Sequence, residues 1–262
     1  MAIINTERFM RILTRKFICI IAAVAALVSC KQDDTLQYNN VTMGNVVNGT
    51  FTSDQGNIFN VVEKNCTGNL ESMDRAIIIC DILKKVEGTD NVYDIRLNHM
   101  AEVPTKAHVN KTTADADPVL SVEDPITFSN IWISGGYLNL YAVFETKSLG
   151  SIQKHHINLV LDEKESSAGK YVFILRHNSS GESFIHEATG IALVSDYAMS
   201  FPITDLIKEN SAEITVKSKW YKNVGDAWSK ETQENSFNIS YTKGGFEHAP
   251  ASYRNNISEK LN

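Results

Sequence analysis

Proline, glycine and long hydrophobic runs are all scarce in this sequence, and each shortage excludes a class of protein. The 262 residues include 5 prolines and 14 glycines, which is too few for a collagen-like or low-complexity chain. Beyond residue 29, no apolar stretch approaches the roughly 18 residues of a membrane-spanning helix. We therefore expect most of the chain to be globular.

Motifs of catalysis are missing as well. There is no glycine-rich loop of the kind that cradles phosphate. Gly181-Glu182-Ser183 lacks the second glycine and the strand-to-helix context of a nucleophile elbow. The sequence thus predicts no catalytic residue, no cofactor and no metal ligand set, and we expect the protein not to be an enzyme.

The longest apolar run is short and lies near the N-terminus. It includes the uninterrupted apolar segment of 11 residues at 17–27 and follows a basic segment with Arg8, Arg11, Arg15 and Lys16, as in a secretory signal peptide. Leu27-Val28-Ser29-Cys30 then has the pattern of a bacterial lipobox. We expect residues 1–29 to be a lipoprotein signal peptide and Cys30 to carry a diacylglyceryl group, since two acyl chains suffice for stable anchoring. The alternative is an ordinary signal peptide with an incidental cysteine.

Acidic residues outnumber basic ones after that segment. Residues 1–29 carry a net charge of +3, so their removal takes the formal charge from −6 to −9. A body this acidic argues against nucleic acid as a partner. The acidic pair Asp33 and Asp34, just after Cys30, resembles the surface-export signal of Bacteroidetes lipoproteins. The alternative is a solvated tether over residues 30–40.

Cysteine is scarce too: besides Cys30, the expected site of lipidation, only Cys66 and Cys80 remain in the mature chain. A disulfide between them would close a loop of about 15 residues, worth about 3 kcal/mol in the chain-entropy model. Alternatively, Cys80 is a small buried hydrophobic residue in an apolar run. The spacing alone does not decide between the two.

From Val41 onward the patterns are those of β-strands. Residues 76–83 are almost entirely apolar, and Tyr93, Ile95 and Leu97 alternate with polar residues, which predicts two strands joined by a turn at residues 87–91. Prolines and aspartates between residues 104 and 125 indicate a domain boundary near residue 115. Further short strands separated by turn clusters predict an antiparallel β-sandwich over residues 116–245, followed by a polar tail at 246–262.

Three phrases of the second half resemble the NigD-like lipoprotein family of Bacteroidetes: Tyr137-Leu138-Asn139, the segment 156–160, and the segment 175–178. Residues 104–106 also resemble that family. The resemblance implies an OB-like β-barrel over residues 41–115 and a C-terminal β-sandwich, so an all-β fold. It implies no activity, because the molecular function of the family is not established.

Histidines are the candidates for chemistry. The adjacent His155 and His156 would point to opposite faces of a strand and could not share one metal ion. His177 and His186 flank a turn and could approach each other, as a metal-dependent or hydrolytic enzyme would require. Alternatively, His156 and His177 form structural hydrogen bonds within the sandwich.

Other side chains have a binding and a structural interpretation. Arg176 could recognise an anion or pair with an acid of the same chain. Aromatic side chains could stack on sugars or fill the core; they are Trp132, Tyr137, Tyr141, Trp220, Tyr221 and Trp228.

These observations favour a lipid-anchored, surface-exposed lipoprotein of the outer membrane, acting as a non-catalytic binding or accessory module. Its partners would be the membrane, through the anchor, and a protein, peptide or glycan. An enzyme using the region of His177 and His186 is the alternative.

Overall fold

A computed structural model describes residues 36–146, 154–182, 193–224 and 227–244. The contacts within the chain divide it into residues 1–36 and residues 37–262, so the described residues lie almost entirely in the second unit. This unit is all-β, which confirms the expected fold class. Among the residues described, no helix is long and apolar enough to cross a membrane. The signal peptide and Cys30 lie outside the described residues.

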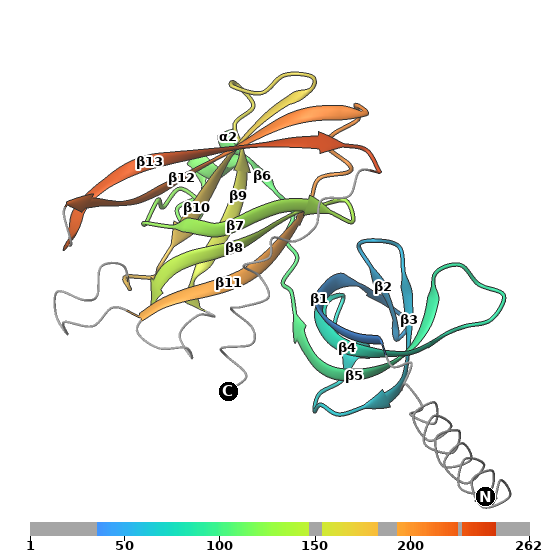
Figure 1. Cartoon of the computed structure of the whole chain (residues 1–262). Helices are drawn as coiled ribbons and strands as arrows, with labels where there is room; N and C mark the ends of the chain where they lie inside the picture. The colour runs from blue at the N-terminus through green and yellow to red at the C-terminus, as the bar shows by residue number, and fades with distance from the viewer. Residues whose placement is uncertain (1–35, 147–153, 183–192, 225–226, 245–262) are drawn as a thin grey trace, which may run out of the picture. The chain divides into compact units, whose positions relative to one another are not determined.

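The first strands form a closed five-stranded barrel (Figure 1). The order around it is β1-β2-β3-β5-β4, with β3 and β5 parallel, and its interior holds Phe51, Phe59, Ile78 and Ile95. The elements are β1 (Leu36–Val47), β2 (Thr50–Ser53), β3 (Ile58–Lys64), the 3-10 turn η1 (Leu70–Ser72), β4 (Arg75–Lys85) and β5 (Val92–Glu102). The barrel confirms the OB-like domain.

The hairpin expected around residues 76–97 is present. β4 and β5 pair antiparallel, with Ile82 opposite Ile95, because apolar side chains on both strands face the barrel interior. The start of the barrel differs from expectation: β1 begins at Leu36, so part of the segment 30–40 is strand rather than tether.

The remaining strands form two facing sheets. The larger has the order β13-β12-β10-β9-β6 and the smaller β11-β8-β7. Most pairings are antiparallel as expected, but β10 with β12 and β6 with β9 are parallel. The elements are β6 (Val109–Asn110), the short helix α2 (Lys111–Ala116), β7 (Thr127–Ser134), β8 (Tyr137–Thr146), β9 (His156–Leu161), β10 (Lys170–Asn178), β11 (Leu193–Pro202), β12 (Ser211–Val224) and β13 (Ala227–Thr242).

The sandwich begins before residue 115, where the sequence places the boundary. β6 pairs with β9 from Val109 to Asn110 and is therefore part of the larger sheet. The segment rich in Pro and Asp that suggested the boundary instead includes α2 and connects β6 of the larger sheet with β7 of the smaller sheet.

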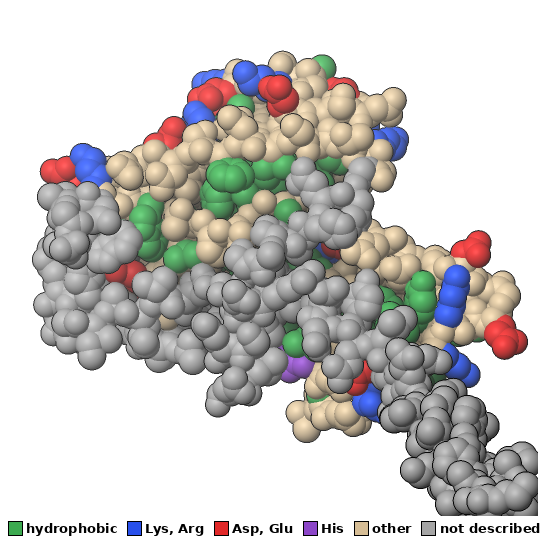
Figure 2. Space-filling view, viewed as in Figure 1, with side chains coloured by type: hydrophobic (Ala, Val, Ile, Leu, Met, Phe, Trp, Pro, Cys, Tyr) green, Lys and Arg blue, Asp and Glu red, His purple; other side chains and the backbone are tan. Residues whose placement is uncertain are grey.

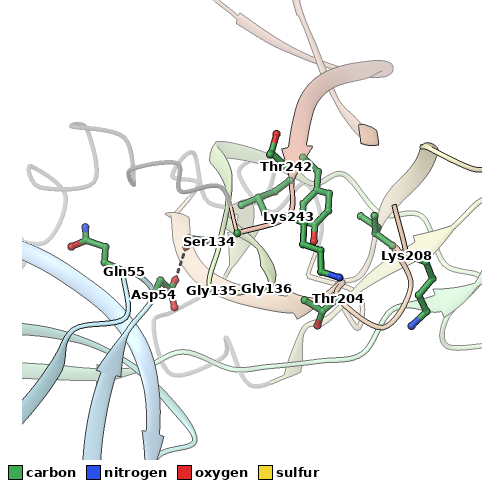
Figure 3. Close-up of a pocket in the computed structure, with 13 residues that line it drawn as sticks. Asp54, Gln55, Ser134, Gly135, Gly136, Thr204, Lys208, Thr242 and Lys243 are labelled. Carbon is green, nitrogen blue, oxygen red and sulfur yellow. Dashed lines mark hydrogen bonds between the residues drawn. The ribbon is translucent and has the colours of Figure 1, made fainter. Parts of the chain in front are cut away.

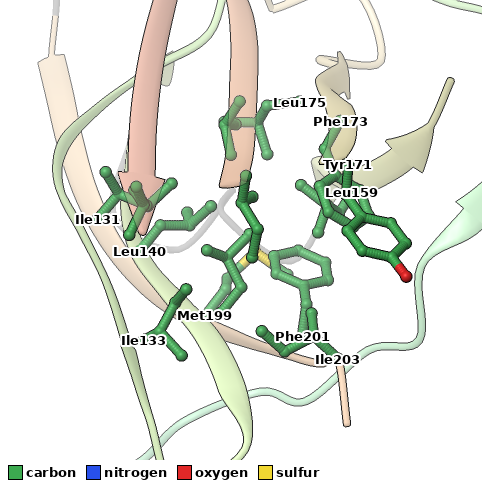
Figure 4. Close-up of a cluster of buried hydrophobic side chains, with 14 of the residues drawn as sticks. Ile131, Ile133, Leu140, Leu159, Tyr171, Phe173, Leu175, Met199, Phe201 and Ile203 are labelled. Atoms are coloured by element: carbon green, nitrogen blue, oxygen red, sulfur yellow. The ribbon is translucent and has the colours of Figure 1, made fainter. Parts of the chain in front are cut away.

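The core of the sandwich lies between its sheets (Figure 4). Leu140 and Phe201 come from the smaller sheet, and Leu159 and Phe173 from the larger; each is 0 % exposed. They belong to one cluster, so the two sheets are held by burial of apolar surface, at about 25 cal/mol per Å².

A buried arginine connects the barrel with the sandwich. Arg75, at the start of β4, is 1 % exposed and donates two hydrogen bonds to the Asp54 carboxylate, at 2.8 and 2.7 Å. It also donates to Asn139 Oδ1 at 3.0 Å and Ser200 Oγ at 2.8 Å, both in the sandwich. Ser134 Oγ donates to Asp54 Oδ2 at 2.5 Å. We call these five residues the Arg75 network.

Replacing Arg75 should destabilise the protein strongly. In an Arg75→Ala variant, Asp54 keeps its buried charge without its cationic partner, which costs about 3–5 kcal/mol. Chemical denaturation of the mature chain measures this loss. Arg96→Ala is the matched control, because Arg96 pairs with Glu63 at the surface, and such pairs contribute about 0–1 kcal/mol. Equal losses in the two variants would contradict the role given to Arg75.

Candidate functional site

A cleft of about 540 Å³ lies where the Arg75 network joins the barrel to the sandwich (Figure 3). One side is the turn after β2, with Asp54 and Gln55, and the other is the end of the sandwich. The sandwich contributes Ile133, Ser134, Gly135, Gly136, Thr204, Ile207, Lys208, Tyr241, Thr242, Lys243 and Gly244. Apolar and polar side chains therefore share the lining.

Two glycines let the turn between β7 and β8 approach its neighbours. Gly135 and Gly136 have φ values of 58° and 86°, in the region where side chains other than glycine are strained. A Cβ atom on Gly135 would collide with the carboxylate of Asp54, and one on Gly136 would lie 2.8 Å from Thr204 Cγ2. These two residues thus form a tight turn between β7 and β8, and this turn forms one wall of the cleft.

Two lysines give the cleft a cationic end. Lys208 and Lys243 line it, and within the described residues neither ammonium group forms a hydrogen bond or an ion pair. Three lysines of β12, by contrast, are paired: Lys217 with Glu165, Lys219 with Glu123 and Lys222 with Glu231. Asp54 does not neutralise the lysines, because its carboxylate is bound by Arg75 and Ser134.

The histidines form a different arrangement from the one expected. His177 Nε2 lies 2.8 Å from His155 Nδ1, and His177 Nδ1 lies 3.1 Å from the carbonyl oxygen of Pro125. Since a carbonyl only accepts, His177 Nδ1 carries a hydrogen, and the neutral ring then accepts a hydrogen bond from His155 at Nε2. His186 lies outside the described residues, so the structure does not test its approach to His177.

The histidine pair is buried. His177 is 1 % exposed, and burial lowers its pKa from 6.5 to about 4. Burial also lowers the pKa of His155, whose Nε2 lies 3.5 Å from a Glu182 oxygen. Phe144 packs against both rings. An enclosed pair of this kind fits a structural role for His177.

His156, by contrast, is exposed, and its side chain has no hydrogen-bond partner among the described residues of the sandwich. The adjacent side chains differ in burial: that of His155 is 0 % exposed, but His155 precedes β9, which begins at His156. Among the residues described, no group of three or more His, Cys, Asp or Glu side chains could hold a metal ion.

Arg176 is paired within the chain. Its Nη2 lies 2.6 Å from Asp115 and 3.2 Å from Glu123, and the side chain is 4 % exposed. Both acids belong to the segment between β6 and β7, so Arg176 fixes this segment to β10. This geometry agrees with the structural interpretation of Arg176.

The aromatic side chains are mostly in the interior. Trp132 and Tyr141 are 2 % and 6 % exposed and pack against each other. Tyr137 lies against the guanidinium of Arg75, 4.1 Å from the ring centroid. Tyr221 is buried and donates to Glu145, and Trp220 is partly exposed. The side chain of Trp228 lies outside the described residues.

The two cysteines are free thiols. Cys80 is 0 % exposed, and burial raises its pKa to about 12, while Cys66 is partly exposed. The disulfide that the spacing allowed is therefore not formed in this structure. Cys80 instead packs as a small hydrophobic residue in the barrel core.

Sequence reasoning missed the cleft and the Arg75 network. One signal was available: Tyr137 and Asn139, in the first of the three family-like phrases, both contact Arg75. An asparagine on an otherwise apolar strand is such a signal, because a buried amide needs partners.

Comparison with known proteins relates the chain to a family. Residues 108–233 match the family model "NigD-like C-terminal beta sandwich domain", which confirms the resemblance seen in the sequence. No curated protein matches.

Solved structures share the fold. A NigD-like immunity protein from Bacteroides caccae is 13% identical with a TM-score of 0.51, covering 78% of this chain and 95% of its own. A suspected lipoprotein from Bacteroides fragilis is 14% identical with a TM-score of 0.52, covering 77% and 96%. A protein of unknown function from Bacteroides vulgatus is 20% identical with a TM-score of 0.52, covering 77% and 90%. At these identities the likeness concerns the fold alone.

Acid should weaken the fold through His177. Its pKa is lowered in the folded state, so the unfolded chain binds more protons between pH 6.5 and 4 and stability falls as the pH falls. From pH 6.5 to 5 the loss should be about 2 kcal/mol. Denaturant titrations at several pH values measure it, and His177→Gln should flatten the slope.

His156→Gln is the control, because it removes an exposed imidazole next to the pair, and it should reduce the slope far less than His177→Gln does. Stoichiometric zinc or copper in the wild type, lost in His177→Gln without loss of stability, would contradict the structural role and support the enzyme.

Proposed function

We propose that this chain, whose residues 108–233 form a NigD-like C-terminal β-sandwich domain, is a lipid-anchored binding module of the outer membrane without catalytic activity of its own. The observation that carries the proposal is the cleft. Its two lysines are unpaired within the described residues, whereas Arg75, Arg176 and His177 are engaged in internal contacts.

The position of the cleft supports a binding role. The Arg75 network fixes the barrel side of the cleft to the sandwich side by direct hydrogen bonds. A preformed site of this kind avoids much of the ordering cost of binding. The buried histidine pair offers no comparable access, since His177 is 1 % exposed.

A protein or peptide is the partner class that we favour. Glycan binding would use exposed aromatic faces, and Trp132, Tyr141 and Tyr221 are buried. The acidic mature chain argues against nucleic acid. One structural relative bears the name of an immunity protein, which would suit a protein partner, but the likeness extends only to the fold.

The proposed location at the outer membrane depends on lipid attachment at Cys30. Cys30 follows a lipobox and precedes Asp33 and Asp34, and we propose that the acidic pair directs the protein to the outer face of the outer membrane. One fold relative is a suspected lipoprotein, which fits this assignment.

Cys30→Ser should abolish lipid modification, because an alcohol cannot replace the thiol that forms the thioether. Metabolic labelling with a fatty-acid analogue, followed by capture of the protein, measures the modification. Cys66→Ser is the matched control and should retain full labelling. Label in the Cys30→Ser protein equal to that in wild type would show that the anchor is elsewhere.

Replacing Asp33 and Asp34 together with alanine should leave the protein lipidated but retained inside the cell. The reason is the proximity of these acids to Cys30. Protease treatment of intact cells should digest the wild type and spare the variant. A control that replaces Glu87 and Asp90, in the turn between β4 and β5, keeps the net charge matched. Equal digestion of all three proteins would contradict the export role of Asp33 and Asp34 and would support a role of this segment as a tether.

A further inference from the structure

Two edge strands of the sandwich face each other without pairing. β7 is the last strand of the smaller sheet and β13 the last of the larger, and within the described residues each pairs on one side only. Hollows lie between them at both ends. One, of about 300 Å³, is lined by 127–131 and 235–237, and the other is the cleft, lined in part by 133–134 and 241–242. We call this line of contact the seam.

The seam lacks the charges that usually protect a free edge. Residues 127–134 of β7 and 235–242 of β13 contain no Asp, Glu, Lys or Arg. Glu231 and Glu234 precede this stretch of β13 and are exposed. Charged residues on an edge strand discourage pairing with another chain, so the protection ends where the seam begins.

The seam also exposes apolar surface. Phe237 is 50% exposed and meets Phe128 of β7 edge to face, with ring centroids 5.8 Å apart. Figure 2 shows a hollow with hydrophobic side chains between β13 and β7. A strand added along an edge would place every second side chain toward such a surface.

β13 is the more regular of the two edges. Its pairing with β12 is continuous from residue 232 to 242, whereas β7 has an irregularity between Phe128 and Asn130. A bulge disturbs the ladder and discourages strand addition. The eight residues from Asn235 to Thr242 offer an edge of about 26 Å.

We propose that the seam binds an extended, acidic peptide segment of a partner protein, which adds as a strand to the free edge of β13 between Asn235 and Thr242. Apolar side chains of the segment cover Phe237, and its carboxylate groups lie at Lys208 and Lys243. The charge of the occupant follows from these two lysines, which are unpaired among the described residues of an otherwise acidic chain. Backbone pairing supplies affinity and the side-chain positions supply selectivity, as in other cases of strand addition. This inference rests on the proposed function as a binding module.

Peptide selection tests the proposal. A phage-displayed library of random octapeptides is selected against the mature chain, 30–262, carrying Cys30→Ser to keep it free of lipid. Enriched peptides should alternate apolar and polar residues and carry Asp or Glu near one end. Failure to enrich any peptide family would overturn the proposal.

Charge reversal then locates the site. Lys208→Glu with Lys243→Glu should weaken binding of an enriched peptide at least about tenfold, as expected when two attractive contacts become repulsive. Lys85→Glu with Lys164→Glu changes the net charge equally at exposed positions away from the seam and should bind as the wild type does. Phe237→Thr should also weaken binding. Equal affinity in all variants would mean that the peptide binds elsewhere on the protein. That result would overturn the proposed binding site at the seam, but not the proposed function as a binding module.

Hydrogen exchange of the same mature chain identifies the occupant. The outward amides between Asn235 and Thr242 should exchange rapidly in the free protein and slowly with the enriched peptide bound. Slow exchange in the free monomer would mean that the chain covers its own edge, and slow exchange that appears only with dimerisation would mean that a second copy does. Either result overturns the proposal. Because these measurements use unlipidated protein, they are independent of the labelling and protease experiments on the anchor.

Discussion

The Arg75–Asp54 ion pair is the interaction on which the arrangement of the two β-domains depends. Burying these charges is costly, and the cost is offset only when every polar group finds a partner. Here the guanidinium meets the Asp54 carboxylate, Asn45, Asn139 and Ser200, and Tyr137 covers its face. The network is directional, so it fixes orientation as well as contact. Apolar packing of Met43 and Ile77 against Trp132 adds non-directional attraction across the same junction.

The cleft is a consequence of this constraint. Asp54 is held by Arg75 and Ser134, and Ser134 leads directly into the Gly135-Gly136 turn. The carboxylate that holds the domains together is therefore also part of the cleft wall. Because Asp54 is already neutralised, the remaining charge of the cleft comes from Lys208 and Lys243. A structural ion pair thus determines the electrostatic character of the site next to it.

Local patterns in the sequence predicted much of the fold and little of the site. The alternation in β5 and the apolar run of β4 were sufficient to predict these two strands, because the pattern of apolar residues within a strand depends on which of its faces are buried. Arg75 could not be interpreted in this way, since Ser200 is 125 residues away. A structural hydrogen bond within the sandwich was one interpretation of His177, but the pattern could not name its partner His155, which lies just outside β9. The strand β6 has only two residues and therefore shows no hydrophobic periodicity. Because it pairs with β9, the sandwich begins before the boundary that the sequence suggested.

The distribution of charge along β13 connects the fold to its use. A 16-residue edge strand is a liability unless something discourages other strands from pairing with it. Glu231 and Glu234 do so along one part, where they also pair with Lys222 and Lys217 of β12. Stability alone would favour continuing such charges to the end of the strand. Instead the last eight residues are uncharged and include the exposed Phe237. They lie next to a cleft whose two lysines have no partner among the residues that the structure describes. An edge protected along one part and open along the other is the pattern expected of a surface that excludes most strands and accepts one.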